Sequence, residues 1–391
     1  MRHVDDAERR ARLARRHAVH PSHRLPDVES ATRAMTVLHS TEPATVYLSL
    51  FARVDGLEVG DVDRALYADR TLVKQLAMRR TLFVFPRDLL PAAWGSASAR
   101  VAANEWQRIA KDAARAGLAA DGDGDAWLKT AREAVLDALA DGPAGAQELR
   151  EGIPELAGKV VISPGTTWGG EVPIAPRVLT QLGASGEIVR GANAGNWRIS
   201  RPSWSSMADW LGSVPEPLTE PEGYAELTRR WLSTFGPATT LDLKWWLGST
   251  LTAARRALAD VGAVEVTVDS GQAWLLPDDL ERVDEPAPWA ALLPVLDPTV
   301  MGWKERDFYL GPHAERLFDR NGNAGTTAWW DGRVVGCWIQ DDAGVVHLRL
   351  AEDVPTEGRA ALAREADRLT DWLGGVRVST VYSSPLMRSS E

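Results

Sequence analysis

Cysteine is almost absent from this chain of 391 residues, and so are long hydrophobic runs. The single Cys337 can form neither an internal disulfide nor a multi-thiolate metal site, which is typical of proteins from a reducing compartment. No apolar stretch approaches the length of a membrane span, and the Arg-rich N-terminus is not followed by an apolar segment. We therefore expect a cytoplasmic protein that does not enter a membrane and that needs no metal and no organic cofactor.

Basic residues are also fewer than acidic ones, and the formal net charge is −10. Such a balance argues against a protein that coats nucleic acid along its whole surface. The basic residues are nevertheless clustered: residues 1–24 hold seven Arg against three acids. Residues 70–87 contain no acid and carry the basic residues Arg70, Lys74, Arg79, Arg80 and Arg87. A local basic face on an acidic protein is therefore expected.

What the chain does contain, 17 Trp and 45% hydrophobic residues, indicates an ordered globular protein of several packed units. Three connectors rich in Gly, Pro or acid, at residues 118–125, 214–222 and 276–288, interrupt the apolar periodicity. They predict four segments, at residues 1–117, 126–213, 222–276 and 287–391.

The second and third segments share one order of elements. In the second, helices at 128–140, from 146 and at 174–182 precede strands at 186–190 and 197–200. In the third, helices at 224–235, 241–247 and 252–261 precede strands at 264–268 and 272–276. Helix, turn, helix, helix, hairpin is the order of a winged helix, a DNA-binding module.

The first segment reads as a divergent copy of this unit, with a short helix at 62–67, a candidate recognition helix at 72–78 and a strand at 81–85. Extra helices at about 7–18, 28–38 and 44–54 precede it. The fourth segment predicts strands at 326–330, 334–340, 345–350 and 376–382, and a helix from Thr356. The predicted fold is α+β and mainly helical: three tandem winged-helix units followed by a C-terminal β-barrel-like segment.

Several stretches resemble the AlkZ/YcaQ-type winged-helix DNA glycosylases over nearly the whole chain. They are 39-HSTEPATVYLSLFAR-53, 63-DRALY-67, 70-RTLV-73, 78-MRRTL-82, 293-LPVLD-297, 318-FDRNG-322 and 331-DGRVVG-336. The resemblance implies three tandem winged helices with an attached barrel, and cleavage of the N-glycosidic bond of alkylated purines, in some members at interstrand crosslinks.

The family's catalytic motif, Gln-x-Gln or Gln-x-Asp, falls here on His39 and Thr41, so that neither family residue is retained. This departure resembles the branch called AlkX. Thr41 could hydrogen-bond a water but cannot accept its proton at neutral pH. His39 or Glu42 could act as the base if either reaches that water. Each also has a structural interpretation, because His39 could cap carbonyl groups and Thr41 or Glu42 could belong to the start of the next helix.

Further residues are candidates for DNA contact or for structural roles. The arginines of residues 9–16 could track phosphates or form a solvated helix face, and Asp297 is more simply explained as a turn-stabilising residue. Arg255 and Arg256 could equally pack through their stems. The expected DNA-binding residues lie in the first unit and in the wing loop of the second: Lys74, Arg79, Arg80, Arg190, Asn193, Asn196 and Arg198.

Three functions follow, with enzymatic activity left open. The first interpretation is a monomeric binder of double-stranded DNA that recognises damaged or branched structures with weak or absent base excision. The second is an active glycosylase that excises N-alkylated purines or unhooks crosslinks. The third is a winged-helix transcriptional regulator; it ranks last because the sequence shows no heptad or obvious dimer helix.

Overall fold

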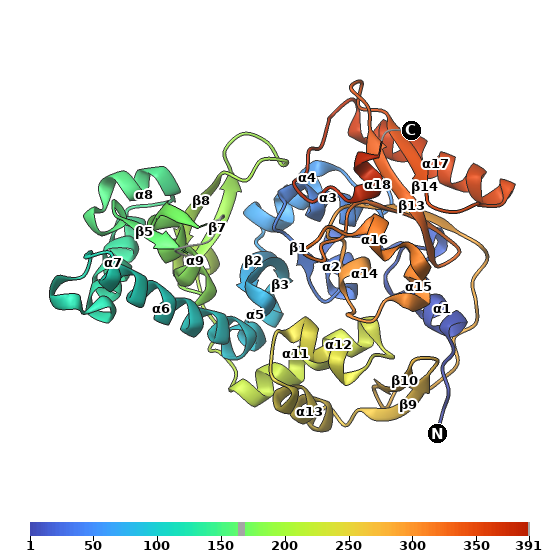
Figure 1. Ribbon diagram of the computed structural model, residues 1–391, viewed down its shortest axis with the longest axis horizontal. Coiled ribbons are helices and arrows are strands. Elements are labelled where there is room, and N and C mark those ends of the chain that lie inside the picture. Colours follow the sequence, from blue (N-terminus) through green and yellow to red (C-terminus); the bar gives the residue numbers. More distant parts are fainter. Residues whose placement is uncertain (163–168, 390–391) are drawn as a thin grey trace. The chain divides into compact units, whose positions relative to one another are not determined.

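The computed structural model describes residues 1–162 and 169–389, which form helices and several small antiparallel sheets (Figure 1). The chain divides into two compact units. The first contains Met1–Ala65 and Ala225–Glu391, and the second is the continuous stretch Leu66–Tyr224. A mixed α+β fold is confirmed.

The second unit begins with a buried β-hairpin. Strands β2 (Leu72–Ala77) and β3 (Thr81–Pro86) pair antiparallel, with Leu72 opposite Pro86. The expected strand at 81–85 is confirmed, but the candidate recognition helix at 72–78 is wrong. Every residue of β2 is buried, so both faces of this segment pack inside the unit, as in a covered strand.

The tip of this hairpin is a tight turn in which Arg79 and Arg80 have φ of 55° and 60°. These left-handed conformations are uncommon for residues other than glycine, and they let the chain reverse within three residues. Helices α5 (Leu90–Gly95) and α6 (Ala97–Arg115) follow the hairpin.

The rest of the second unit is a helical cluster with short hairpins. Its helices are α7 (Gly124–Ala140), α8 (Ala146–Gly152), α9 (Ala175–Ala184) and α10 (Met207–Leu211). Its strands are β4 (Ala144–Gly145), β5 (Lys159–Ile162), β6 (Gly170–Pro173), β7 (Ile188–Asn193) and β8 (Pro202–Ser206). The three expected helices are confirmed. The expected strand at 197–200 is wrong, because these residues belong to the β7–β8 loop and the partner strand begins at Pro202.

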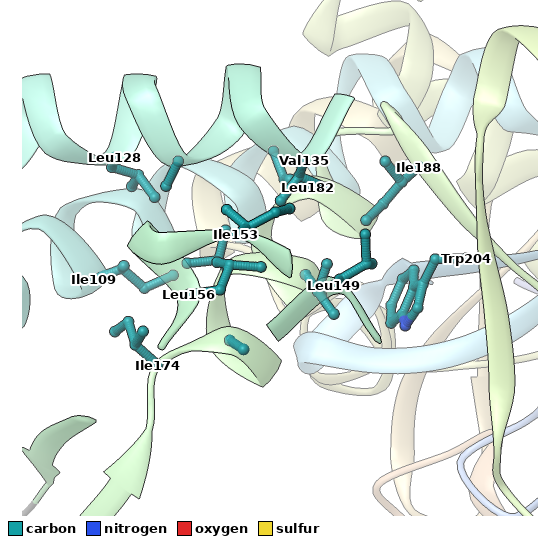
Figure 2. Packing of buried hydrophobic residues seen from close by; sticks show 14 of the residues in the cluster. Ile109, Leu128, Val135, Leu149, Ile153, Leu156, Ile174, Leu182, Ile188 and Trp204 are labelled. Carbon is teal, nitrogen blue, oxygen red and sulfur yellow. The ribbon is translucent and has the colours of Figure 1, made fainter. Parts of the chain in front are cut away.

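One apolar core holds this unit together. Side chains from α6, α7, α8, α9, β7 and β8 meet there, among them Ile109, Leu128, Leu149, Leu182 and Trp204 (Figure 2). Helices α6 and α7 approach closely at Gly124, where a Cβ would lie 1.9 Å from the carbonyl oxygen of Ala110. Glycine at the start of α7 therefore permits this packing.

The middle of the chain gives helix, helix, helix, hairpin once more. Helix α11 (Glu220–Phe235) crosses the boundary between the units; α12 (Thr240–Leu247), α13 (Leu251–Asp260), β9 (Val264–Val268) and β10 (Gly271–Leu275) lie in the first unit. All five elements are confirmed. Thr239 and Asp242 form a reciprocal capping box that fixes the start of α12.

The N-terminal part of the first unit is helical. It contains α1 (Asp6–Arg16), α2 (Val28–Ala34), the short β1 (Leu38–His39), α3 (Pro43–Phe51) and α4 (Val59–Asp63). The three extra helices are confirmed. The helix expected at 62–67 instead begins at Val59 and passes into a π-helical turn at Arg64–Ala68.

The C-terminal part contains an antiparallel sheet in the order β11-β12-β13-β14. The strands are β11 (Ala290–Leu293), β12 (Thr327–Trp330), β13 (Arg333–Gln340) and β14 (Val346–Leu350). Its helices are α14 (Pro298–Met301), α15 (Asp307–Leu310), α16 (Ala314–Leu317), α17 (Thr356–Leu373) and α18 (Pro385–Arg388). Within the described residues β11 and β14 are the edges of an open sheet, so the expected barrel-like closure is not seen. The strand expected at 376–382 is wrong, because this stretch is irregular.

Candidate functional site

Residues 39–42 connect β1 to α3. Pro43 occupies the first turn of α3, where its fixed φ and missing N–H favour the start of a helix. His39 and Ser40 are buried, Thr41 is exposed and Glu42 is partly buried at the N-cap of α3. The Glu42 side chain makes no capping hydrogen bond, so its carboxylate is directed to another partner.

That partner is the irregular segment near residue 380. One Glu42 oxygen, Oε1, accepts hydrogen bonds from the Thr380 hydroxyl at 2.8 Å and from the Val381 N–H at 2.9 Å. Burial raises the pKa of Glu42 above its ordinary value, while the two hydrogen bonds act in the opposite direction. The carboxylate consequently has two properties: it fastens a distant segment, and it is more basic than an exposed glutamate.

A cavity of about 320 Å³ opens beside Glu42. Polar side chains of α3, β13 and the 377–383 segment contribute to its wall, including Thr45, Gln340 and Ser383. Of His39, Thr41 and Glu42, only Glu42 is among the described residues that line it. A water or a small polar group can therefore reach this one acid-base side chain of the motif.

The 376–384 segment is held by side chains in place of strand pairing. The Gln340 amide donates to the Val376 carbonyl at 3.0 Å, and its oxygen accepts from the Val378 N–H at 2.9 Å. Burial, with the charges of Glu42 and Asp319, raises the pKa of Tyr382 in the same segment. The cavity wall is thus built by tertiary contacts that a periodicity pattern does not contain.

Asp297 has a structural environment. It is fully buried, receives two hydrogen bonds from Arg53 at 2.7 and 2.9 Å, and accepts another from the Ser49 hydroxyl at 2.7 Å. It also caps α14 by accepting from the Thr299 N–H at 2.9 Å. This carboxylate stabilises a turn and neutralises a buried arginine, in agreement with its expected turn-stabilising role.

The arginines of α1 mostly face the protein. Arg12 donates to Glu8, Asp279 and the Glu281 carbonyl, and the Arg9 guanidinium stacks 3.7 Å over the Phe308 ring. Arg16 also pairs with Asp279, and Arg10 donates to the Phe308 carbonyl. Of the five arginines in this run only Arg15 is exposed, so the run does not present a continuous phosphate-binding face.

The expected DNA-binding residues of the first hairpin are separated by burial. Lys74 is buried in β2, and its ammonium donates to the Tyr67 hydroxyl at 2.6 Å. Arg79 and Arg80 lie at the hairpin tip, where Arg79 is partly buried and Arg80 is exposed. Arg80 forms an ion pair with Glu105 of α6 at 3.2 Å. Arg80 is therefore exposed at the hairpin tip, whereas Lys74 is covered.

The loop between β7 and β8 is ordered by its own asparagines. Asn193 accepts from the Arg201 N–H at 3.1 Å, and Asn196 accepts from the Arg198 N–H at 3.0 Å. The Arg190 guanidinium lies 5.1 Å from the Trp204 ring centre, and burial lowers its pKa. Asn193, Asn196 and Arg198 thus share one loop, whereas Arg190 packs at its base.

Comparisons with known proteins match this architecture. The family model described as "DNA glycosylase AlkZ-like" matches residues 32–372. The chain belongs to this AlkZ-like family. Among solved structures, the Streptomyces sahachiroi DNA glycosylase AlkZ is similar with a TM-score of 0.72 at 19% identity, covering 94% of this chain and 98% of that one. At this identity the likeness shows a shared fold. No curated protein matches the chain.

This AlkZ-like chain also carries arginines that the sequence analysis missed. Arg108 and Arg115 lie on α6, a helix that was not predicted, and Arg177 lies on α9. The apolar positions Ala102, Ile109 and Ala113, spaced for one helical face, could have revealed α6.

Two features are not found in the described part of the AlkZ-like chain. Among the described residues, no group of three or more His, Cys, Asp or Glu side chains could hold a metal ion. In the same part of the chain, no helix has both the length and the apolar character needed to cross a membrane.

Proposed function

We propose that this AlkZ-like protein binds double-stranded DNA and recognises damaged or branched structures, with weak or absent base excision. Membership of a DNA glycosylase family supports DNA as the partner. The hydrogen bonds of Glu42 support weak or absent base excision. The carboxylate that could serve as a base instead holds residues 380 and 381 in place. Thr41 cannot replace it, and His39 is buried.

The departure at both motif positions supports an AlkX-like branch for this chain. The order of elements supports a division into winged-helix units at 126–213 and 222–276. Helices α7, α8 and α9 precede a hairpin in the first of these units, and helices α11, α12 and α13 precede a hairpin in the second. Residues 1–117 remain a divergent third unit in this proposal. In this unit Arg80, one of the expected DNA-contact residues, is exposed at the tip of a hairpin and not on a recognition helix.

An active glycosylase is the second candidate, and one observation favours it. Glu42 lines an open cavity, and its raised pKa makes it a better proton acceptor than an exposed carboxylate. In that case a water in the cavity would add to C1′ of the sugar of an N-alkylated purine, or of a crosslinked base, and give its proton to Glu42. The C1′–N bond would break, and its electron pair would leave on the base.

A pair of substitutions separates anchoring from base catalysis. Glu42→Gln keeps an oxygen that can accept from Thr380 and Val381 but removes the proton acceptor, whereas Glu42→Ala removes both. We would measure base release from N7-methylguanine and crosslinked duplexes, together with binding to matched, gapped and junction DNA. Glu357→Gln, an exposed acid in the first turn of α17, is the control with the same charge change.

Our proposal predicts binding by wild type, base release that is slow or at the level of buffer alone, and binding by Glu42→Gln equal to wild type. Rapid base release that Glu42→Gln or His39→Ala abolishes would overturn it in favour of the glycosylase. Conversion of both His39 and Thr41 to Gln tests whether the remaining cavity supports excision once the family residues are restored.

A further inference from the structure

A groove of about 630 Å³ lies in the unit formed by residues 66–224, away from the residues of the 39–42 motif in sequence. One wall is a face of α6, and the other is formed by β5, β6 and the start of α9. Its charged lining consists of four arginines and two acids: Arg80, Arg108, Arg115, Arg177, Glu105 and Asp112. The described lining therefore carries a net charge of +2, in a protein whose total is −10.

The charges form a repeated unit. Glu105 lies between Arg80 at 3.2 Å and Arg108 at 3.1 Å. Seven residues further along α6, Asp112 lies between Arg177 at 2.8 Å and Arg115 at 3.9 Å. Seven residues are two helical turns, so the two units share one face of α6 and are separated by about 10 Å along its axis.

The outer arginine of each unit is open to solvent. The Arg108 and Arg115 side chains are 67% and 63% exposed, while their acids are largely covered. A guanidinium has five N–H donors in a planar fork, and a single carboxylate contact leaves capacity for a second anion. The acids thus hold the arginines in position and only partly neutralise them.

Apart from Arg177, the facing wall is apolar. Val161 of β5 is 56% exposed, and Pro173 and Pro176 continue the same side of the groove. A nucleic-acid strand has this pairing of properties, because regularly spaced phosphates alternate with sugars that present apolar faces. An acidic peptide offers carboxylates without that alternation, which makes it the weaker match.

We propose that this groove binds the phosphodiester backbone of a nucleic-acid strand, with Arg108 and Arg115 as phosphate contacts additional to the hairpin tip. The inference rests on the proposed DNA binding and names a surface for it. Each arginine–phosphate contact releases condensed counterions, so each contributes close to one unit to the salt dependence of binding.

The test uses the whole protein and fluorescence anisotropy with a labelled duplex and the corresponding single strand, over a series of salt concentrations. Arg108→Glu combined with Arg115→Glu should weaken binding about tenfold or more and lower the slope of log affinity against log salt by about two. Arg359→Glu combined with Arg364→Glu on α17 is the control: both side chains are exposed, and Arg359 pairs with an acid as a typical surface arginine does.

A second variant reverses the sign of the effect. Asp112→Asn keeps the shape of the side chain but releases Arg177 and Arg115 from its charge, so binding should tighten by about threefold. Asp353→Asn, the partner of Arg359, makes the same change in net charge outside the groove and should have less effect. Circular dichroism and thermal unfolding would establish that all variants are folded.

The outcomes are distinct. Unchanged affinity and salt slope in the folded Arg108/Arg115 variant, or a loss equal to that of the Arg359/Arg364 control, would overturn the groove and leave the proposed function standing. Competition by polyglutamate as effective as competition by DNA at equal charge would assign the groove to acidic peptides. Wild-type protein that binds no DNA at low salt would overturn both proposals.

Discussion

Helices α1 and α6 both carry several arginines, but the two sets have opposite environments. On α1 the Arg12 side chain is 1% exposed and its guanidinium is surrounded by acids and carbonyl oxygens. On α6 the acids are covered and the arginines project outward. The density of arginine in a sequence therefore says little about an anion-binding face, because the partners that bury a guanidinium, such as Asp279 for Arg12, can lie far along the chain.

The comparison predicts its largest effect at Arg12. Arg12→Ala should lower the free energy of unfolding by about 3–5 kcal/mol, because it leaves the buried Glu8 without that partner and opens space between α1 and residues 279–281. Urea denaturation at neutral pH measures this loss. Arg15→Ala, on the exposed side of the same helix, should change stability by no more than about 0.5 kcal/mol. Similar losses in the two variants would mean that α1 does not pack as described.

The inward character of α1 extends to the residue that caps it, His17. This side chain is fully buried, its Nε2–H donates to the Thr234 carbonyl, and Nδ1 lies 2.9 Å from the Thr299 hydroxyl. Burial first, and the Arg53 charge second, lower the pKa of His17 well below its ordinary value. At pH values below its ordinary pKa, His17 therefore binds a proton in the unfolded chain but stays neutral in the folded protein.

Stability contributed by neutral His17 is complete above pH 6.5 and decreases as the pH falls below that value, by about 1.4 kcal/mol per pH unit until the folded-state pKa is reached. Urea denaturation at intervals between pH 7.5 and 5 measures this slope. His3→Gln, a change at an exposed histidine, should retain the slope, whereas His17→Gln should flatten it. An equal slope in wild type and His17→Gln would contradict the assignment.

The smallest effect on stability is expected on α6. Arg108→Ala should reduce the free energy of unfolding by less than about 1 kcal/mol, because the ion pair is exposed on the arginine side and Glu105 keeps Arg80 as a partner. Chemical denaturation of this variant beside Arg12→Ala gives the contrast directly. A loss as large as that of Arg12→Ala would show that the α6 arginines serve folding and not binding.

Local patterns in the sequence were sufficient for most helices of the two repeated units. Caps and turns such as Thr239 before α12 mark boundaries within a few residues, so these elements need no knowledge of distant partners. The same is true of the β9–β10 and β12–β13 hairpins, whose turns carry glycine.

Elements defined by distant partners were the ones predicted wrongly. In β2, Lys74 and Gln75 are polar but buried, because each has a hydrogen-bond partner. Lys74 donates to the Tyr67 hydroxyl, and the Gln75 side-chain oxygen accepts from the Trp94 indole N–H. Two polar residues in an apolar stretch favour an amphipathic helix until those partners are known. Residues 376–382 alternate as a strand would, yet their backbone is satisfied by the side chain of Gln340.

The candidate site was predicted in part for the same reason. The chemistry of Glu42 could be read from its position after His39 and Thr41, but its contact with Thr380 could not. The exposed α6 arginines were missed because that helix was not predicted. Their exposure, in contrast to the burial of Arg12 on α1, also depends on the tertiary structure.

The contact between Glu42 and Thr380 also has a consequence in time. It joins residues 338 positions apart, and ribosomes elongate at about 5–20 residues per second, so roughly 20–70 seconds separate the synthesis of its two sides. Helix α3 can form early in that interval, but the wall contributed by residues 377–383 cannot. A nascent chain therefore carries Glu42 without Thr380 and Val381, and the cavity beside Glu42 is completed only after residues 377–383 have been synthesised.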